Sequence, residues 1–214
     1  MWYNISCNQE RNQEEKEMEN IKLFEKELNL IICEDLRAAV REFLIDGTPS
    51  YFWTDGASSS GKYHPAFSQG LGGLVRHTKA VVMFAEELLR MSSYAYMTDE
   101  YKDYVIAACI LHDTCKYGID EFSKDEYKLH SRNAAKAFKN FCEQVMDYQP
   151  SEFLLQAIRS HMGQWSTNAD DKPFTPIDRC VHMADYMASR SFIDIPTITE
   201  EYNAVMAENE ELPF

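Results

Sequence analysis

The chain has 214 residues, of which 45% are hydrophobic, so it is long enough to form one domain with a substantial buried core. Its formal net charge of -14 excludes a broad basic surface for duplex DNA or an anionic membrane, while a small local basic pocket stays compatible with it. No segment approaches the ~18 consecutive apolar residues of a membrane helix, and residues 1–20 are too polar and acidic for a secretion signal.

The first part of the chain, residues 1–49, is predicted to be a helical extension that packs on the core. Residues 12–45 carry apolar side chains at near-helical spacing, which indicates one or two amphipathic helices. Asp46-Gly47-Thr48-Pro49 then ends the helical pattern. We expect residues 51–61, which combine Tyr51-Phe52-Trp53 with small residues, to form a loop.

A bundle of helices is predicted over residues 50–190. Apolar residues recur there at helical spacing, and glycine or polar stretches separate the periodic segments. No stretch sustains the alternation of a strand, so the predicted fold class is all-α. The expected helices cover approximately residues 74–91, 99–111, 130–147, 151–162 and 175–190.

The end of the chain, residues 191–214, is predicted to be an acidic C-terminal tail. It carries Ile195-Pro196 and the acidic run Glu208-Asn209-Glu210-Glu211. We expect a peripheral wrap or a partly disordered end. The sequence shows neither an internal repeat nor a separate second domain.

The pair His112-Asp113 closes the apolar stretch of the second expected helix. An imidazole nitrogen and a carboxylate can each hold a divalent cation, and the carboxylate can bridge two cations. Each histidine alone has an ordinary explanation at a helix surface or in the core. Helix ends of an antiparallel bundle can converge at one layer, however, and a converging set without thiols indicates Mn, Fe, Co, Ni, Mg or Zn. The other members of the set are His77, His130, His161 and Asp185.

Taken in order, His77, His112-Asp113 and Asp185 resemble the H…HD…D pattern of the HD-domain metal-dependent phosphohydrolase superfamily, whose fold is a bundle of α-helices. The likeness covers residues 50–190, and part of it is similar to the HD domain of 3′-to-5′ exoribonucleases. It rests on four runs in the same order with comparable separations: Ser60-Gly61-Lys62-Tyr63-His64-Pro65, Gly72-Gly73-Leu74-Val75-Arg76-His77-Thr78, His112-Asp113-x-x-Lys116 and Ala184-Asp185-x-x-Ala188-Ser189-Arg190.

The resemblance implies one or two divalent cations. A first cation would be held by His77, His112, Asp113 and Asp185. In the two-metal subgroup the HD aspartate bridges, and two further histidines, here matched by His130 and His161, complete a second site. The chain departs from the pattern at one point, because many two-metal members have a His-His pair where this chain has His161-Met162.

The implied activity is hydrolysis of a phosphate ester or anhydride of a nucleotide or short oligonucleotide, through attack by a metal-bound hydroxide. The catalytic roles fall on Asp113 and Lys116. Lys116, one turn after His112, is placed to contact a phosphate oxygen and to offset charge in the transition state. The alternative for Lys116 is a solvated lysine at a helix end.

Candidates for substrate binding are basic or aromatic residues near the predicted ligands: Lys62, His64, Arg76, Lys116, Arg132 and Trp165. Lys62 and His64 lie in a loop that could close over the site or simply be exposed. Arg76 and Arg132 could bind phosphate, with a surface salt bridge as the alternative. Trp165 could stack on a base or could pack in the core or in a lid.

Two other functions stay open at the level of sequence. The His, His-Asp, His, His, Asp order also resembles diiron oxygenases of the same fold, such as myo-inositol oxygenase. A non-catalytic nucleotide-binding module is the second alternative, and loss of a metal ligand would mark it. The expected partner is a small phosphorylated molecule rather than duplex nucleic acid or a membrane, and a homo-oligomer is compatible with the sequence.

The cysteines bear on the compartment. None forms a C-x-x-C pair, and several lie in apolar helical contexts, which indicates reduced thiols in a cytoplasmic protein and no zinc knuckle. The six are Cys7, Cys33, Cys109, Cys115, Cys142 and Cys180.

Overall fold

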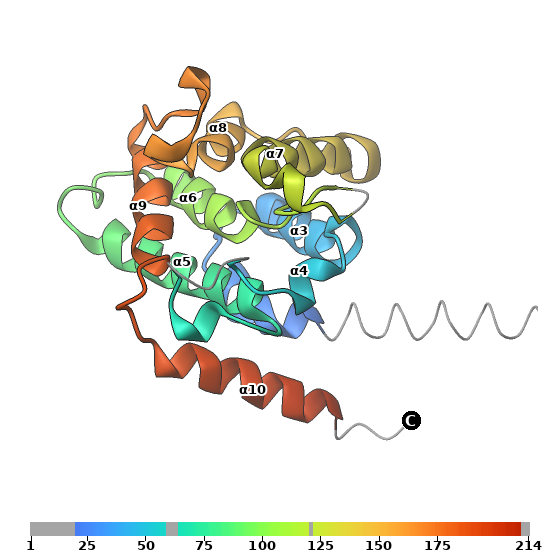
Figure 1. Cartoon of the computed structure of the whole chain (residues 1–214). Helices are drawn as coiled ribbons and strands as arrows, with labels where there is room; N and C mark the ends of the chain where they lie inside the picture. Colours follow the sequence, from blue (N-terminus) through green and yellow to red (C-terminus); the bar gives the residue numbers. More distant parts are fainter. Residues whose placement is uncertain (1–19, 59–63, 120–121, 211–214) are drawn as a thin grey trace, which may run out of the picture.

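A computed structural model describes residues 20–58, 64–119 and 122–210 (Figure 1). All regular structure in these ranges is helical, which confirms the predicted all-α fold class. No helix among the described residues is long and apolar enough to cross a membrane.

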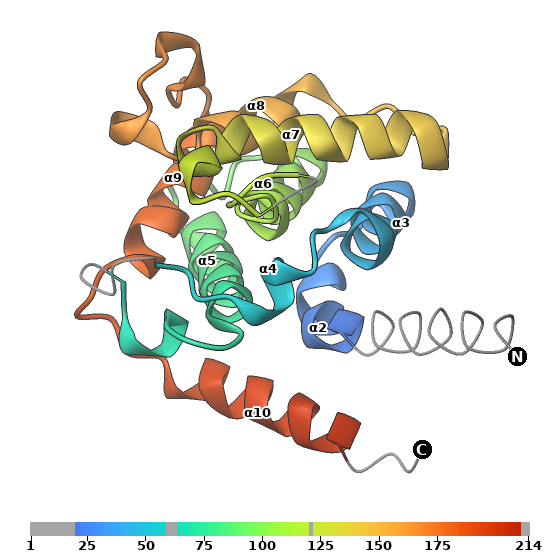
Figure 2. The same ribbon diagram turned by 45° about the vertical axis from the view of Figure 1, so that its right-hand side comes forward.

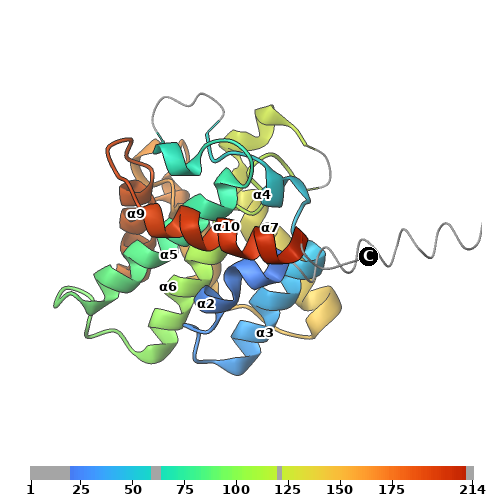
Figure 3. The same cartoon turned by 90° about the horizontal axis from the view of Figure 1, so that it is seen from below.

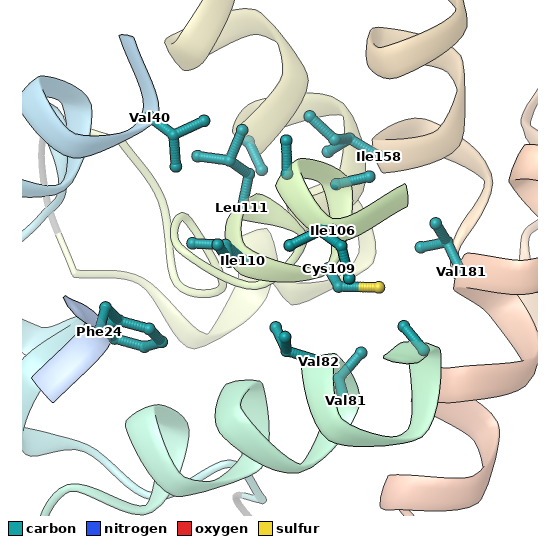
Figure 4. Close-up of a cluster of buried hydrophobic side chains, with 14 of the residues drawn as sticks. Phe24, Val40, Val81, Val82, Ile106, Cys109, Ile110, Leu111, Ile158 and Val181 are labelled. Atoms are coloured by element: carbon teal, nitrogen blue, oxygen red, sulfur yellow. The ribbon is translucent and has the colours of Figure 1, made fainter. Parts of the chain in front are cut away.

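The central helix of the bundle is α6, Asp99–Leu111, and it is buried because its second half is apolar on every side. Residues 105–111 are all buried. It contacts α5 (Gly73–Arg90), α8 (Glu152–Ser160) and α9 (Pro176–Ala188). Figure 4 shows side chains of these helices around it, among them Val82, Ile158 and Val181. Burial of each such side chain stabilises the folded state by about 1.5–3 kcal/mol. The packing of α6 therefore fixes the position of its C-terminal end, which His112 and Asp113 follow.

The ends of the helices around α6 carry recognisable capping residues. Thr98 accepts a hydrogen bond from the Tyr101 backbone N–H at the start of α6. Thr175 and Asp178 form a capping box at the start of α9, with Pro176 at the first helical position. Ser151 caps α8. These local signals explain why the predicted boundaries of the bundle lie close to the observed ones.

α7, His130–Phe141, packs on α8 and continues as a π-helical turn over Cys142–Met146. The shorter segments between the main helices are 3-10 turns. They are Ala66–Ser68, Lys124–Lys128, Gly163–Trp165 and Ala169–Asp171.

The N-terminal helices share the hydrophobic core of the bundle. They are the 3-10 turn Lys22–Phe24, α2 (Glu25–Leu28), α3 (Glu34–Glu42) with a π-helical turn Phe43–Gly47, and α4 (Tyr51–Thr54). The prediction of a loop over residues 51–61 is wrong for residues 51–54, which form α4. Phe52 and Trp53 are buried against Phe24, and this aromatic packing holds one turn of helix. Residues 59–63 of that expected loop and residues 1–19 of the expected extension lie outside the described residues.

A buried ion pair joins the N-terminal helices to α5. Lys79 Nζ donates to Glu27 Oε1 at 2.7 Å and to the Leu23 carbonyl at 2.8 Å, and both charged side chains are almost fully buried. Glu27 Oε2 has no hydrogen-bond partner among the described residues. The carboxylate of Glu27 therefore depends on Lys79 for its compensation.

Replacing Lys79 by methionine is expected to lower the free energy of unfolding by about 3–5 kcal/mol, because Glu27 is then an unpaired charge in the interior. Urea unfolding followed by circular dichroism measures the loss. The double variant Lys79→Met/Glu27→Leu removes both charges and should recover a large part of it. A double variant as unstable as the single one would show that the pair is not the cause.

Of the two alternatives expected for the C-terminal segment, the described residues match the peripheral wrap, because the segment contains α10, Pro196–Glu210. Residues 211–214 lie outside the described residues. Figures 2 and 3 show α10 crossing the bundle at α5, and the two helices are in contact. Ile195, Ile198 and Tyr202 are buried there. Gly72 lies under the Tyr202 ring with φ of 67°, and a side chain at this position would collide with that ring. The helix is therefore a packed element that covers the turn before α5.

Candidate metal centre

The predicted metal ligands come together at the ends of five helices. Their positions follow from the bundle: His77 lies in the first turns of α5, His112 is the C-cap of α6 and is followed by Asp113, His130 begins α7, His161 is the C-cap of α8, and Asp185 lies in α9. All are buried except Asp185, which is partly exposed. The helices therefore bring into one cluster side chains that are far apart in the sequence.

One side of the cluster is formed by His77, His112 and Asp185, whose ligand atoms all lie within 4.8 Å of one another. His77 Nε2 is 3.1 Å from Asp185 Oδ1 and 3.4 Å from His112 Nε2. Asp113 Oδ2 faces the same two imidazoles, at 3.8 Å from His77 Nε2 and 3.6 Å from His112 Nε2. Two histidines and two carboxylates thus surround one position.

The other side of the cluster is formed by His130 and His161. Their Nε2 atoms are 2.9 Å apart, and both face Asp113 Oδ1, at 3.2 Å and 3.8 Å respectively. Asp113 Oδ1 is buried and has no hydrogen-bond partner among the described residues. Asp113 therefore presents one oxygen to each pair of histidines, which is the arrangement of a bridging carboxylate.

The hydrogen bonds of the imidazoles decide which nitrogen is free to bind a cation. Nδ1 of His112 lies 2.8 Å from the Cys109 carbonyl, and Nδ1 of His161 lies 2.8 Å from the Ile158 carbonyl. His130 Nδ1 contacts the carbonyl of Tyr127 in the same way. A carbonyl only accepts, so each of these Nδ1 atoms must donate, and Nε2 of the neutral ring carries a lone pair.

Lone pairs that face each other in a buried cluster repel. The 2.9 Å between Nε2 of His130 and Nε2 of His161 is therefore a contact that a cation would stabilise. The donor set of imidazole and carboxylate, without thiolate, suits Mn, Fe, Co, Ni, Mg or Zn. The described residues thus fit one cation on each side of Asp113.

Burial sets the protonation states that metal binding needs. It lowers the pKa of His161 to about 3, and it lowers the pKa of His112 and His130 below the ordinary histidine value. Burial alone would raise the pKa of Asp113, but Lys116 and the surrounding histidines hold it well below its usual range. Burial alone would also raise the pKa of Asp185, but the hydrogen bond from His77 and the charges of His112, His77 and His161 together lower it. At neutral pH His112, His130 and His161 are therefore neutral imidazoles, and Asp113 and Asp185 are ionised carboxylates.

These shifts make the metal-free protein sensitive to acid. His64 and His161 each have a pKa of about 3 in the folded chain, against 6.5 for an unperturbed histidine. Between these values the unfolded chain binds protons that the folded chain excludes, so the free energy of unfolding falls as pH is lowered from about 6.5 towards 3. Each histidine contributes a slope of up to about 1.4 kcal/mol per pH unit. Urea unfolding in EDTA at several pH values measures it. His64→Gln should reduce the slope by one such contribution, and an unchanged slope would contradict this account.

A pocket of about 680 Å³ opens onto the cluster. Asp113, His130, His161 and Asp185 line its metal-facing part. Lys116 also lines it, and its Nζ donates to Asp113 Oδ2 at 2.5 Å. Burial alone would lower the pKa of Lys116, but Asp113 raises it, so the ammonium group stays charged.

The other predicted substrate-binding residues divide into two groups. His64 and Trp165 line the pocket, and the His64 ring lies against His77 with centroids 5.4 Å apart. Arg76 and Arg132 are not among its lining residues. Lys62 lies outside the described residues.

The two arginines are engaged elsewhere. Arg76 donates from Nε to the Phe67 carbonyl at 2.5 Å and from Nη2 to the Gln69 carbonyl at 2.9 Å, and its guanidinium lies 4.7 Å from the centroid of the Tyr202 ring. It thus holds the turn before α5 and is no candidate for direct phosphate contact. Arg132 Nε donates to Asp171 Oδ2 at 2.6 Å, which is the salt-bridge alternative considered from the sequence.

Several pocket residues were not expected from the sequence. Arg190, Tyr127 and Ser58 line the pocket, as does Met162, which follows His161. Arg190 belongs to the run that ends the HD-like region, and its position five residues after Asp185, just beyond the end of α9, could have indicated it. Tyr127 and Ser58 carry no comparable signal, because Tyr127 lies in a short 3-10 turn and Ser58 in a loop, outside the runs that resemble the family.

Comparison with known proteins agrees with this geometry. The family model described as HD domain matches residues 74–190. Searches against curated proteins and against solved structures gave no match. HD domains bind divalent metals and form a superfamily of metal-dependent hydrolases. The matched segment covers more than half of the chain and contains all six predicted metal ligands. The chain therefore belongs to the HD domain family.

Proposed function

We propose that the protein is a phosphohydrolase that cleaves a phosphate ester or anhydride of a nucleotide or short oligonucleotide. One observation carries the proposal: Asp113 directs one carboxylate oxygen to each pair of histidines, beside a pocket that also contains a partly buried, charged lysine. Such a site combines ligands for two cations with a positive group for a phosphate oxygen.

The residues of the cluster would have different roles in binding the cations. Bound divalent cations would supply a water of lowered pKa and polarise the phosphoryl group. Asp113 would hold both cations, with His77, His112 and Asp185 on one side and His130 and His161 on the other. The carbonyl partners of the Nδ1 atoms keep the imidazoles oriented, so that little reorganisation is needed when a cation binds.

Lys116 would contact substrate phosphate. Without cations its Nζ lies 2.5 Å from Asp113 Oδ2 and neutralises that oxygen. With the carboxylate engaged by cations, the ammonium group is available to a phosphate oxygen and to the negative charge that grows on it. No protein nucleophile is required for this chemistry.

The proposal includes a small phosphorylated partner and a cytoplasmic location. The chain carries a net charge of -14, which opposes contact with long nucleic acid or an anionic membrane. The five cysteines among the described residues form no disulfide with one another, which fits a reducing compartment. Lys116 and Arg190 in the pocket wall favour an anionic substrate over the polyol of an oxygenase, and every first-site ligand is present, unlike in a degenerate binding module.

The test is a hydrolysis screen with the full chain. Deoxynucleoside triphosphates, nucleoside monophosphates, cyclic dinucleotides and short RNA are each incubated with Mn, Co, Ni, Mg or Zn, and released phosphate or nucleotide products are measured. Turnover of one class that EDTA abolishes is expected. Absence of turnover in every combination, together with a mixed-valent diiron signal and oxygen uptake, would replace the hydrolase by an oxygenase.

A further inference from the structure

An aromatic cluster stands in the pocket wall beside the metal centre. Trp165 stacks on Tyr186 of α9, with ring centroids 5.6 Å apart and planes 13° from parallel. The guanidinium of Arg190 lies 4.2 Å from the Tyr186 centroid and 5.7 Å from the Trp165 centroid. We call these three residues the Trp165 platform. Trp165 and Arg190 line the pocket that also contains Asp113.

Hydrogen bonds of Arg190 hold the platform in place. Arg190 donates from Nε to the Tyr186 carbonyl at 3.0 Å and from Nη2 to Ser189 Oγ at 2.8 Å. Its Nη1 makes no hydrogen bond among the described residues, so one donor group remains for a ligand. The Trp165 indole, by contrast, is 48% exposed, which is high for a tryptophan beside such a cluster.

The platform is also tied to a predicted metal ligand. His182 donates from Nδ1 to the His161 carbonyl at 2.7 Å, and its ring lies 6.2 Å from that of Trp165. Gly163, with φ of 56°, makes the turn between His161 and Trp165, and the His182 ring fills the space where a side chain would stand. Trp165 therefore follows the Gly163 turn by two residues, and a planar group stacked on Trp165 would lie close to the segment that carries His161.

We propose that the Trp165 platform binds the base of a nucleotide whose phosphate lies at the metal centre, so that the pocket prefers base-bearing phosphates to base-free ones. The position of the phosphate rests on the proposed function. An open indole face binds any base, because every base has a flat π-surface, and a preorganised face loses little entropy on binding. The planar Arg190 guanidinium adds a cationic edge that a base carbonyl or ring nitrogen can accept from.

The experiment compares AMP with ribose 5-phosphate, which has the same phosphate and sugar without the base. Binding is measured by equilibrium dialysis on the full chain without metal, so that no turnover occurs. The unaltered chain should bind AMP more tightly than ribose 5-phosphate. Trp165→Ala should weaken AMP binding by on the order of 10- to 100-fold and leave ribose 5-phosphate within about 2-fold. Trp165→Phe keeps an aromatic face and should retain most of the affinity.

Phe174→Ala is the matched control, because Phe174 is an aromatic residue that is 81% exposed and does not line the pocket. Equal affinity of the unaltered chain for the two ligands, or an equal loss of both in Trp165→Ala, would overturn the platform. This result would leave the hydrolysis screen unaffected. Conversely, if the hydrolysis screen shows no turnover but AMP binding depends on Trp165, the proposed hydrolase function is overturned and the Trp165 platform is retained.

Discussion

Asp113→Asn is expected to remove both divalent cations and to lower phosphohydrolase turnover by on the order of 10³-fold. The physical reason is that this carboxylate faces both histidine pairs, with Oδ2 within 3.8 Å of His77 Nε2 and Oδ1 3.2 Å from His130 Nε2. An amide is a poor ligand and supplies no charge to either cation. Metal content by mass spectrometry after dialysis, and turnover of the substrate found in the screen, are the measurements.

The same substitution leaves Lys116 without its buried partner, so a loss of stability must be separated from a loss of metal. Asp113→Asn/Lys116→Met removes both charges and should recover stability without recovering metal. Asp194→Asn is the control, because it makes the same aspartate-to-asparagine change at an exposed residue after α9, away from the metal centre. Bound metal or unchanged turnover in Asp113→Asn would refute the bridging role.

His161→Gln is expected to halve the metal content, from two cations per chain to one, and to reduce turnover by on the order of 10²-fold. His161 and His130 are the two imidazoles that face Asp113 Oδ1, so loss of either ring leaves a cation there with too few ligands. The core should tolerate glutamine better than alanine, because glutamine fills more of the buried space. Metal titration by calorimetry gives the stoichiometry.

His77→Gln is the matched variant on the opposite side of Asp113. We expect it to retain one cation as well, so that each single histidine variant keeps the site it does not touch, whereas Asp113→Asn keeps neither. A chain that binds a single cation before any substitution would restrict the metal centre to the side of His77. The departure at Met162, where many two-metal relatives have a second histidine, would then be its explanation.

The sequence was sufficient to predict those elements whose structure depends on neighbouring residues. The helices of the bundle follow from apolar spacing and capping residues, and the predicted metal ligands lie near the ends of these helices. Local rules failed where distant packing dominates. Residues 51–54 form a helical turn because Phe52 and Trp53 meet Phe24. The sequence left two alternatives for the C-terminal segment, and the packing of Tyr202 on Gly72 matches the peripheral wrap.

The basic residues show the same division. Arg76 and Arg132 stand near ligands in the sequence, but a long guanidinium side chain goes to whichever acceptor lies within its reach. For Arg76 these acceptors are two carbonyls of the turn before α5, and for Arg132 the acceptor is Asp171. Arg190, which reaches the pocket, differs from them only in what surrounds it. Nearness to a predicted ligand in the sequence therefore does not by itself show whether an arginine reaches the pocket.

By itself, the sequence determined the all-α fold, and it predicted the histidines and aspartates that could bind metal, because helical periodicity and side-chain chemistry are properties of neighbouring residues. The tertiary structure alone decided that Asp113 turns one oxygen to each histidine pair, and that Trp165, Tyr186 and Arg190 meet in one wall of the pocket. These arrangements depend on how helices distant in the chain cross and pack, and that geometry is fixed by the shared core rather than by any single segment.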